Sequence, residues 1–306
     1  MKIKIKKIYK YLPQKVESLE HLCKINKWDK KKIYSKTGIL EKRVSGKKQT
    51  IKDLIIGLRK KNKIPELKDC GLMILVTQTP HYLIPANIHF FQKVFNVNHN
   101  SIAFDVNQGC SGYVHGLAIC NSMIEKLNIK KAALITCDTY SKYISKNNRT
   151  TRTLFGDAIT VSILEKSNKK HFFGFKLGSN HKGFDNFKMN KNEILMNGAE
   201  MYNFGSSSIP NEINSILNSS KIKKNDIKFY LFHQASKLIL DTISRKLNIP
   251  EKKIVRNIMK VGNTVSSSIP LLIYDLINKK KLKSNDIILM SGFGVGYSWG
   301  SCIYKN

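Results

Sequence analysis

One cysteine lies where its thiol could act as a nucleophile. Cys110 stands in the sequence Gly-Cys-Ser-Gly, after an apolar run at 102–106 and before a segment, 113–127, with apolar residues at helical spacing. This predicts a strand-to-helix turn, where the free N–H groups and positive dipole of a helix end stabilise a thiolate and lower the cysteine pKa. The flanking glycines allow the tight turn and the approach of a substrate. The alternative is a small core cysteine, the more common fate of a free thiol.

Two further polar residues lie at comparable corners. His233 follows the apolar run 229–232 and precedes a helical pattern at 236–247, and Asn263 lies in a turn that opens another helix. Side chains at the carboxyl ends of parallel strands point into the crevice where α/β proteins bind ligands. A hydrogen-bonded structural histidine and a helix N-cap asparagine are the alternatives. Taken together, the cysteine, histidine and asparagine could converge on one site.

The chain ends in a glycine-rich segment, 291–300, directly after the apolar run 287–290. Gly292, Gly294 and Gly296 alternate along it, and glycine weakens a strand. We therefore expect a loop whose backbone amides approach a ligand oxygen, as an oxyanion hole requires. A phosphate-binding loop is the alternative, but the spacing fits neither a P-loop nor a dinucleotide fingerprint.

The turns that carry these residues, each at the end of an apolar run, belong to a duplicated pattern. The apolar runs occur at 72–76, 102–106 and 132–136 in the first half, and at 229–232, from Ile254 and at 287–290 in the second. Such repetition indicates a duplicated strand–helix unit with buried parallel strands between helices. We predict an α/β fold of two similar halves, residues 1–168 with the cysteine and 169–306 with the histidine and asparagine. The seam between them is the natural place for a site.

Composition narrows the class of protein further. A chain of 306 residues, 42% of them hydrophobic, can bury a large core. No run approaches the roughly 18 apolar residues of a membrane-spanning helix, and the alternating Lys and Ile at the start are not a signal-peptide core. The six cysteines form no CxxC pair and have no histidine at metal-ligand spacing. We expect a cytoplasmic protein without disulfides, metal or membrane contact.

The net charge of +32 raises nucleic-acid binding as a hypothesis. The lysines, however, are spread over nearly every polar turn and helix face, together with many Asn and Ile, as a genome rich in adenine and thymine would produce. No nucleic-acid motif is visible. We therefore expect no nucleic-acid partner, whereas a basic surface that steers an acidic protein partner stays open.

With these residues identified, the sequence resembles the β-ketoacyl-acyl carrier protein synthase III family over essentially its whole length. The matching motifs are Lys36-Thr-Gly-Ile39 with Glu41 and Arg43, Asp105 to Gly112, Leu154-Phe-Gly-Asp157, His233-Gln-Ala235, Gly262-Asn-Thr264 and a glycine-rich terminus ending in Trp299-Gly300. The resemblance implies a thiolase-like fold whose duplicated halves form a layered αβαβα arrangement. Details such as Thr79-Pro80 are similar to divergent members associated with bacterial surface-polysaccharide gene clusters.

The resemblance also implies a reaction, a decarboxylating Claisen condensation through an acyl-cysteine intermediate. Cys110 would take the acyl group from acyl-CoA or an acyl carrier protein, splitting one difficult step into two easier ones. His233 and Asn263 would bind the thioester carbonyl of a malonyl group on acyl carrier protein. The backbone N–H groups of Cys110 and Val295 would hold the oxyanion, and no cofactor beyond the substrates would take part.

Further binding positions follow from the same resemblance. They are Arg149 for the adenine of coenzyme A, Gly198 and Tyr202 for the pantetheine channel, and Arg245 and Lys246 for the acidic carrier protein. The resemblance implies a homodimer in which a residue near Ile84 reaches toward the partner's acyl pocket. Lys32 departs from the family pattern, because an adenine-stacking tryptophan is usual there, and Ser236 replaces the customary asparagine.

Two other functions remain as alternatives. Cys110 could transfer its acyl group to an amino sugar, a hydroxyl or another acceptor without condensation, and malonyl-dependent release of carbon dioxide discriminates between the two reactions. The alternative without catalysis is a basic nucleic-acid-binding protein, which would keep its cellular activity after Cys110→Ala.

Overall fold

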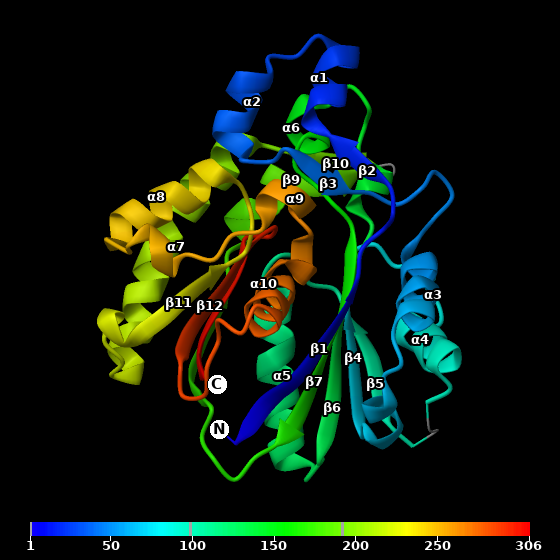
Figure 1. Cartoon of the computed structure of the whole chain (residues 1–306), viewed down its shortest axis with the longest axis vertical. Coiled ribbons are helices and arrows are strands. Elements are labelled where there is room, and N and C mark those ends of the chain that lie inside the picture. The colour runs from blue at the N-terminus through cyan, green and yellow to red at the C-terminus, as the bar shows by residue number, and fades with distance from the viewer. Residues whose placement is uncertain (1, 98–99, 191–192) are drawn as a thin grey trace.

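The computed structural model describes residues 2–97, 100–190 and 193–306, and its strands form two main sheets (Figure 1). The first sheet has the order β1-β7-β6-β4-β5, with β1 Ile3–Tyr11, β7 Ala158–Lys166, β6 Lys131–Asp138, β4 Leu72–Val76 and β5 Ile102–Val106. The second has the order β11-β12-β13-β8, with β11 Ile227–Phe232, β12 Ile287–Gly294, β13 Ser298–Lys305 and β8 Phe172–Ser179.

Helices fill the space between the sheets and cover their outer faces (Figure 1). Between the sheets lie α5, Gly112–Lys126, and α10, Ser268–Asn278, each of which contacts strands of both. The outer pairs are α3 Ile51–Lys61 with α4 Asn87–Phe95 on the first sheet, and α7 Gly198–Ser220 with α8 Lys237–Leu247 on the second. The predicted αβαβα arrangement is therefore confirmed.

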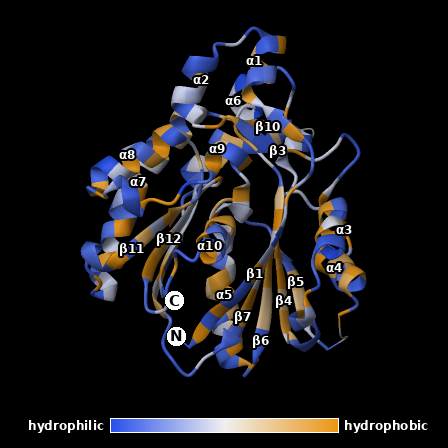
Figure 2. Cartoon of the chain, in the orientation of Figure 1, coloured by the Kyte–Doolittle hydropathy of each residue, from blue (hydrophilic) through white to orange (hydrophobic). Residues whose placement is uncertain are grey.

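Burial on both faces explains the composition of the central strands. All five residues of β4, Leu-Met-Ile-Leu-Val, are inaccessible to solvent, because helices pack on each side of the sheet. Figure 2 shows hydrophobic colours along the first sheet and hydrophilic ones on α2 above it. In α5, Gly116 permits close packing, since a Cβ there would lie 2.4 Å from Leu134. The apolar core thus holds α5 firmly, and Cys110 lies just before its first turn.

Strand pairing repeats in the two halves. In the first, β4 runs parallel to β6, which pairs antiparallel with β7; in the second, β11 runs parallel to β12, which pairs antiparallel with β13. The predicted boundary at 168/169 falls between the end of β7 and the start of β8. Because the halves correspond, the carboxyl ends of β4, β5, β6, β11 and β12 lie near the seam.

One predicted strand is absent from the described structure. Ile254 forms only an isolated bridge with Tyr230 instead of the strand that would match β5. The cause lies in Gln234, whose side chain takes the backbone partners that a ladder would need: Nε2 donates to Val255 O and Oε1 accepts from the N–H of Asn257. The second sheet therefore has four strands where the first has five.

Short elements surround the carboxyl ends of the strands (Figure 1). They are β2 Val16–Ser18, α1 Leu19–Asn26, α2 Lys30–Thr37, β3 Glu41–Arg43, α6 Arg149–Arg152, β9 Phe187–Asn190, β10 Glu193–Met196 and α9 Ile258–Val261. Among the described residues, no helix has the length and apolar character needed to cross a membrane.

Candidate active site

Residues of both halves line one cavity of about 590 Å³ at the seam. Cys110 comes from the first half, and His233 and Asn263 come from the second. Toward the mouth, Arg149 of α6 and Lys32 of α2 contribute to the lining. The wall of the cavity also contains four other residues named in the sequence analysis: Lys36, Gly198, Tyr202 and Ser236. The tertiary structure therefore brings together three polar side chains that are far apart in the sequence.

Cys110 lies in the turn between β5 and α5, as predicted, and is buried. The N–H of Gly112 donates to Gly109 O at 2.8 Å, which closes the turn around the cysteine. The predicted lowering of its pKa is wrong for this site: burial raises the pKa of the Cys110 thiol, and the nearby Asp138 carboxylate adds to the rise. At neutral pH the side chain is therefore a thiol and not a thiolate.

The glycine-rich segment is mostly strand instead of loop. Gly292 and Gly294 belong to β12, and only residues 295–297 form the turn to β13. Glycine is present in this strand because the strand passes very close to Cys110. A Cβ on Gly292 would lie 2.5 Å from Cys110 O, and one on Gly294 would lie 2.9 Å from Cys110 Sγ. Glycine weakens this strand, but it leaves room for the Cys110 side chain.

Gly294→Ala should slow acyl transfer to Cys110 at least tenfold, because the new methyl group would crowd the sulfur by overpacking. Gly174→Ala in β8 is the matched control, since a Cβ there meets nothing closer than 3.9 Å. Intact-protein mass spectrometry over time measures the acyl adduct in both variants. Equal loading rates in the two would contradict the proposed approach of Gly294 to the sulfur.

His233 follows β11 and is almost fully buried. Its backbone N–H donates to Ser291 O at 2.8 Å, while its side-chain Nδ1 has no hydrogen-bond partner among the described residues. Burial lowers the pKa of His233 to about 3, although the backbone of Val265 acts in the opposite direction. The ring is therefore neutral near pH 7, with one N–H to donate and one nitrogen to accept.

The depressed pKa of His233 predicts a loss of stability in mild acid. Below pH 6.5 the unfolded chain protonates this histidine while the folded chain does not, so the free energy of unfolding falls as pH falls. Between pH 7 and pH 5 the fall should be about 2 kcal/mol smaller in His233→Gln. Urea unfolding at both pH values measures the difference. The raised pKa of Asp138 acts oppositely but is common to both proteins, and an unchanged difference would contradict a neutral His233.

Asn263 is clamped by its backbone and oriented by its side chain. Its N–H donates to Leu154 O and its carbonyl accepts from the N–H of Gly156, each at 2.9 Å. Its Oδ1 accepts from the N–H of Val265 at 3.0 Å, and Val265 has a φ of 52°, which is unusual for a β-branched residue. Asn263 is thus not the N-cap of α10, whose cap is Ser267. Since Oδ1 is occupied, Nδ2 is left to donate into the cavity.

Sequence reasoning missed Asp138, a buried carboxylate at the end of β6. It accepts from the N–H of Gln78 at 2.8 Å and from Ser266 Oγ at 2.6 Å, and so joins the loop after β4 to the loop after Asn263. Burial raises its pKa to about 7. The sequence did contain a signal for Asp138. It is a polar residue at the carboxyl end of a buried strand, and His233 directly follows the end of another.

The predicted binding residues occupy different places in and around the cavity. Arg149 and Lys32 are exposed at the mouth of the cavity, whereas Gly198 and Tyr202 line the wall formed by α7. Arg245 and Lys246 are exposed in the last turn of α8, roughly 12 Å along the helix from its cavity end. Val295 does not line the cavity; it packs, half-buried, in the apolar cluster that includes Cys110.

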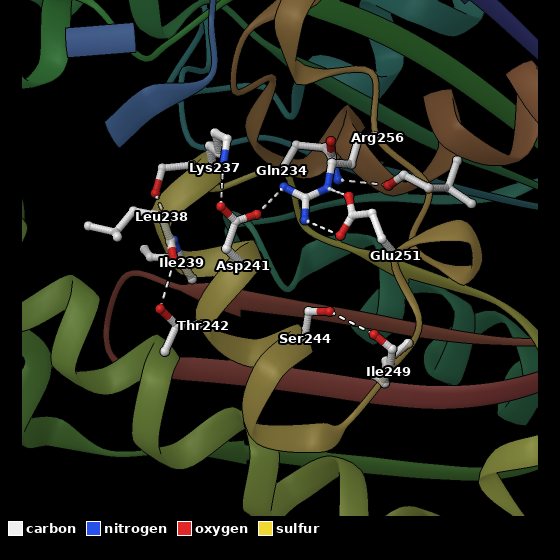
Figure 3. Close-up of polar contacts among 12 residues, drawn as sticks. Gln234, Lys237, Leu238, Ile239, Asp241, Thr242, Ser244, Ile249, Glu251 and Arg256 are labelled. Atoms are coloured by element: carbon white, nitrogen blue, oxygen red, sulfur yellow. Dashed lines mark hydrogen bonds and ion pairs between the residues drawn. The ribbon is translucent and has the colours of Figure 1, made fainter. Parts of the chain in front are cut away.

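The start of α8 is fixed by a set of ion pairs (Figure 3). Asp241 pairs with Lys237 and with Arg256, at 2.8 Å from the latter, and Arg256 also pairs with Glu251 at 3.0 Å. Ser236 is the N-cap, and its Oγ accepts from the N–H of Ile239. The serine that departs from the family pattern is therefore a suitable helix cap.

Comparison with known proteins agrees with this geometry. Residues 104–181 match the family 3-oxoacyl-[acyl-carrier-protein (ACP)] synthase III, and residues 217–306 match its C-terminal part. A β-ketoacyl-[acyl-carrier-protein] synthase III of Prochlorococcus marinus (strain MIT 9312) is 30% identical over 96% of this chain and 94% of that protein. One of Streptococcus agalactiae serotype III (strain NEM316) is 31% identical over 99% and 98%.

Solved structures agree as well. A 2.1 Å crystal structure of a 3-oxoacyl-(acyl-carrier-protein) synthase III superimposes with a TM-score of 0.95 at 28% identity, covering 100% of both chains. The Aquifex aeolicus VF5 protein of that name gives 0.92 at 28%, covering 99% of this chain and 100% of its own. Fold and relatives together define an acyltransferase of the thiolase-like fold. Within that class, the chain belongs to the β-ketoacyl-acyl carrier protein synthase III family.

Proposed function

We propose that the protein condenses an acyl primer, carried by coenzyme A or acyl carrier protein, with malonyl-acyl carrier protein in fatty acid biosynthesis. The observation that carries this proposal is the convergence of Cys110, His233 and Asn263 on one cavity in a chain of this family. In the first step the Cys110 sulfur attacks the primer thioester. A new carbon–sulfur bond forms, the old one breaks, and the released thiol takes up the cysteine's proton.

The second step depends on the orientation of His233 and Asn263. The neutral imidazole has one N–H, and Asn263 Nδ2 is left to donate because Oδ1 is occupied. Both donors suit the thioester oxygen of a malonyl group, on which negative charge grows as carbon dioxide leaves. The resulting carbon nucleophile then attacks the acyl carbon on Cys110, the carbon–sulfur bond to the cysteine breaks, and the departing thiolate regains its proton from water. These steps use only side chains, backbone amides, water and the two thioesters.

Intact-protein mass spectrometry tests the two steps separately. The chain is incubated with a panel of acyl-CoAs and acyl carrier proteins, and malonyl carrier protein is added afterwards. We expect a single acyl adduct that malonyl carrier protein discharges with release of carbon dioxide. An adduct that stays until a sugar or hydroxyl acceptor is supplied would instead support acyl transfer without condensation, and the absence of any adduct would refute the proposal.

The proposed substrate contacts follow the cavity from mouth to thiol. Arg149 at the mouth is offered for the nucleotide of coenzyme A, and Gly198 and Tyr202 for the pantetheine arm. Arg245 and Lys246 are offered for the acidic carrier protein, with long-range attraction as the physical basis. The backbone N–H groups of Cys110 and Val295 are offered for the oxyanion. The cytoplasmic location expected from the sequence is part of the same proposal.

A homodimer is also part of the proposal, and an exposed apolar loop supports it. Leu83 and Ile84 are 93% and 89% exposed, yet Asn87 holds their loop, accepting from the N–H groups of His81 and Tyr82 at 2.9 Å. The strand β5 lies at one edge of its sheet, where unpaired backbone groups favour addition of another strand.

Replacing both apolar residues, Leu83→Lys with Ile84→Lys, should convert a dimer into a monomer, because two desolvated lysines would oppose association. Light scattering during size-exclusion chromatography measures the mass. Lys126→Ala, on the exposed end of α5, serves as a surface control. A wild-type protein that is monomeric at micromolar concentration would contradict the homodimer.

A further inference from the structure

Three ionic side chains, two of them buried and the third half-buried, form a triplet beside the cavity. Glu17 and Lys42 lie directly opposite each other on the antiparallel strands β2 and β3, and they are only 7% and 1% exposed. Lys42 Nζ lies 2.7 Å from Glu17 Oε1, and the other carboxylate oxygen pairs with the Arg152 guanidinium. Burial lowers the pKa of Lys42, whereas the Glu17 carboxylate opposes that change. Because the catalytic steps above use none of these groups, their role needs another explanation.

The triplet joins the segments that hold Asn263. Arg152 ends α6, and two residues later Leu154 O accepts from the N–H of Asn263. On the other side, the stem of Lys42 packs against Gly262, where a Cβ would lie 2.9 Å from Lys42 Cβ. Gly262 has a φ of 74° and directly precedes Asn263. Glu17 is therefore the common partner of two cations whose own chain segments contact the backbone on either side of Asn263 in the sequence.

A second set of contacts fixes β3 itself. Leu40, just before the strand, donates its N–H to Met259 O at 3.0 Å, and Arg43 O accepts from the N–H of Asp157 at 2.8 Å. Lys42 thus has little freedom to move away from Gly262. A buried ion pair rarely adds net stability over a well-packed apolar pair, but it fixes geometry because each charge is costly to leave unpaired.

We infer that Glu17, with Lys42 and Arg152, is a positioning residue that sets the place of Asn263 for the malonyl half of the reaction. The inference rests on the proposed function. The triplet contacts the backbone around Asn263, whereas Cys110 is held by other elements, namely β5, α5 and the glycines of β12. Disturbing the triplet should affect release of carbon dioxide much more than acyl loading.

The test compares the two half-reactions in single turnovers. In Glu17→Gln, which leaves the buried Lys42 and the half-buried Arg152 without their carboxylate, release of carbon dioxide from malonyl carrier protein should fall at least tenfold. Loading of Cys110 from acyl-CoA, followed by intact mass, should change less than about threefold. In a chain that already has Asn263→Asp, adding Glu17→Gln should lower the release of carbon dioxide by less than about twofold further. The oriented amide that Glu17 is inferred to position is already absent from that chain.

Two more variants keep the test decisive if Glu17→Gln fails to fold. Lys42→Met retains the Glu17–Arg152 pair and the stem against Gly262. It should lower the ratio of carbon dioxide release to Cys110 loading, as Glu17→Gln does. Lys42→Arg, which keeps the positive charge, should lower that ratio less than Lys42→Met. Lys131→Met is the control, because it breaks a partly buried ion pair with Asp69 and Glu165 at the far end of β6.

The outcomes separate this inference from the proposed function. Equal losses in loading and in carbon dioxide release, or a lower Tm with both rates unchanged, would show that the triplet is merely structural. A ratio shifted as strongly by Lys131→Met would also overturn the inference. Wild-type protein that releases no carbon dioxide would instead count against the proposed function.

Discussion

Cys110→Ala should abolish the acyl adduct and lower condensation by about 10⁴-fold or more, because the residue that holds the acyl group is lost. Mass spectrometry after incubation with acyl-CoA measures the first effect, and product formation from malonyl carrier protein measures the second. The fold should survive, since the side chain is small and the turn around it is closed by backbone bonds. Carbon dioxide release without product should persist, because His233 and Asn263 are untouched.

Cys120→Ala is the matched control for this experiment. Cys120 lies on the same helix, α5, and is also buried, but it does not line the cavity. Its thiol has a raised pKa from burial, as that of Cys110 does. We expect normal loading in Cys120→Ala. An adduct that survives Cys110→Ala and disappears in Cys120→Ala would show that Cys120, and not Cys110, is the nucleophile.

Asn263→Asp should lower carbon dioxide release by about 10²–10³-fold while Cys110 still loads. The substitution keeps an oxygen that accepts from the N–H of Val265, so the local turn is retained. It replaces the Nδ2 donor with a second carboxylate oxygen, which repels the negative charge that forms on the substrate. Stopped-assay release of labelled carbon dioxide measures the loss.

Asn257→Asp controls for the added charge. Asn257 is a half-buried neighbour of the same loop, and its Nδ2 donates to Asp275 outside the cavity. We expect it to lower the stability of the chain but to leave carbon dioxide release from the folded protein within about threefold. If Asn263→Asp retained full release, the role proposed for the side chain would be wrong.

Several features were predictable from the sequence because local patterns determine them. The strand-to-helix turn at Cys110 follows from an apolar run, two glycines and helical spacing, and it matches the structure. The duplicated order of strands predicted two similar α/β halves, and the family resemblance implied their layered arrangement. Three expectations failed because they depended on distant neighbours. Gln234 takes the backbone partners of the strand at Ile254, Cys110 explains the glycines of β12, and burial reverses the pKa shift of the thiol.

The sequence by itself determined the order of the elements, the corners that carry Cys110, His233 and Asn263, and the family. It did so because periodicity and short motifs are local properties of the chain. Only the tertiary structure decided how those corners are held. Asp138 joins the loops of two halves, and Glu17 pairs with cations that are 25 and 135 residues away along the chain. Such contacts have no local pattern, since their partners meet only after the sheets and helices have packed.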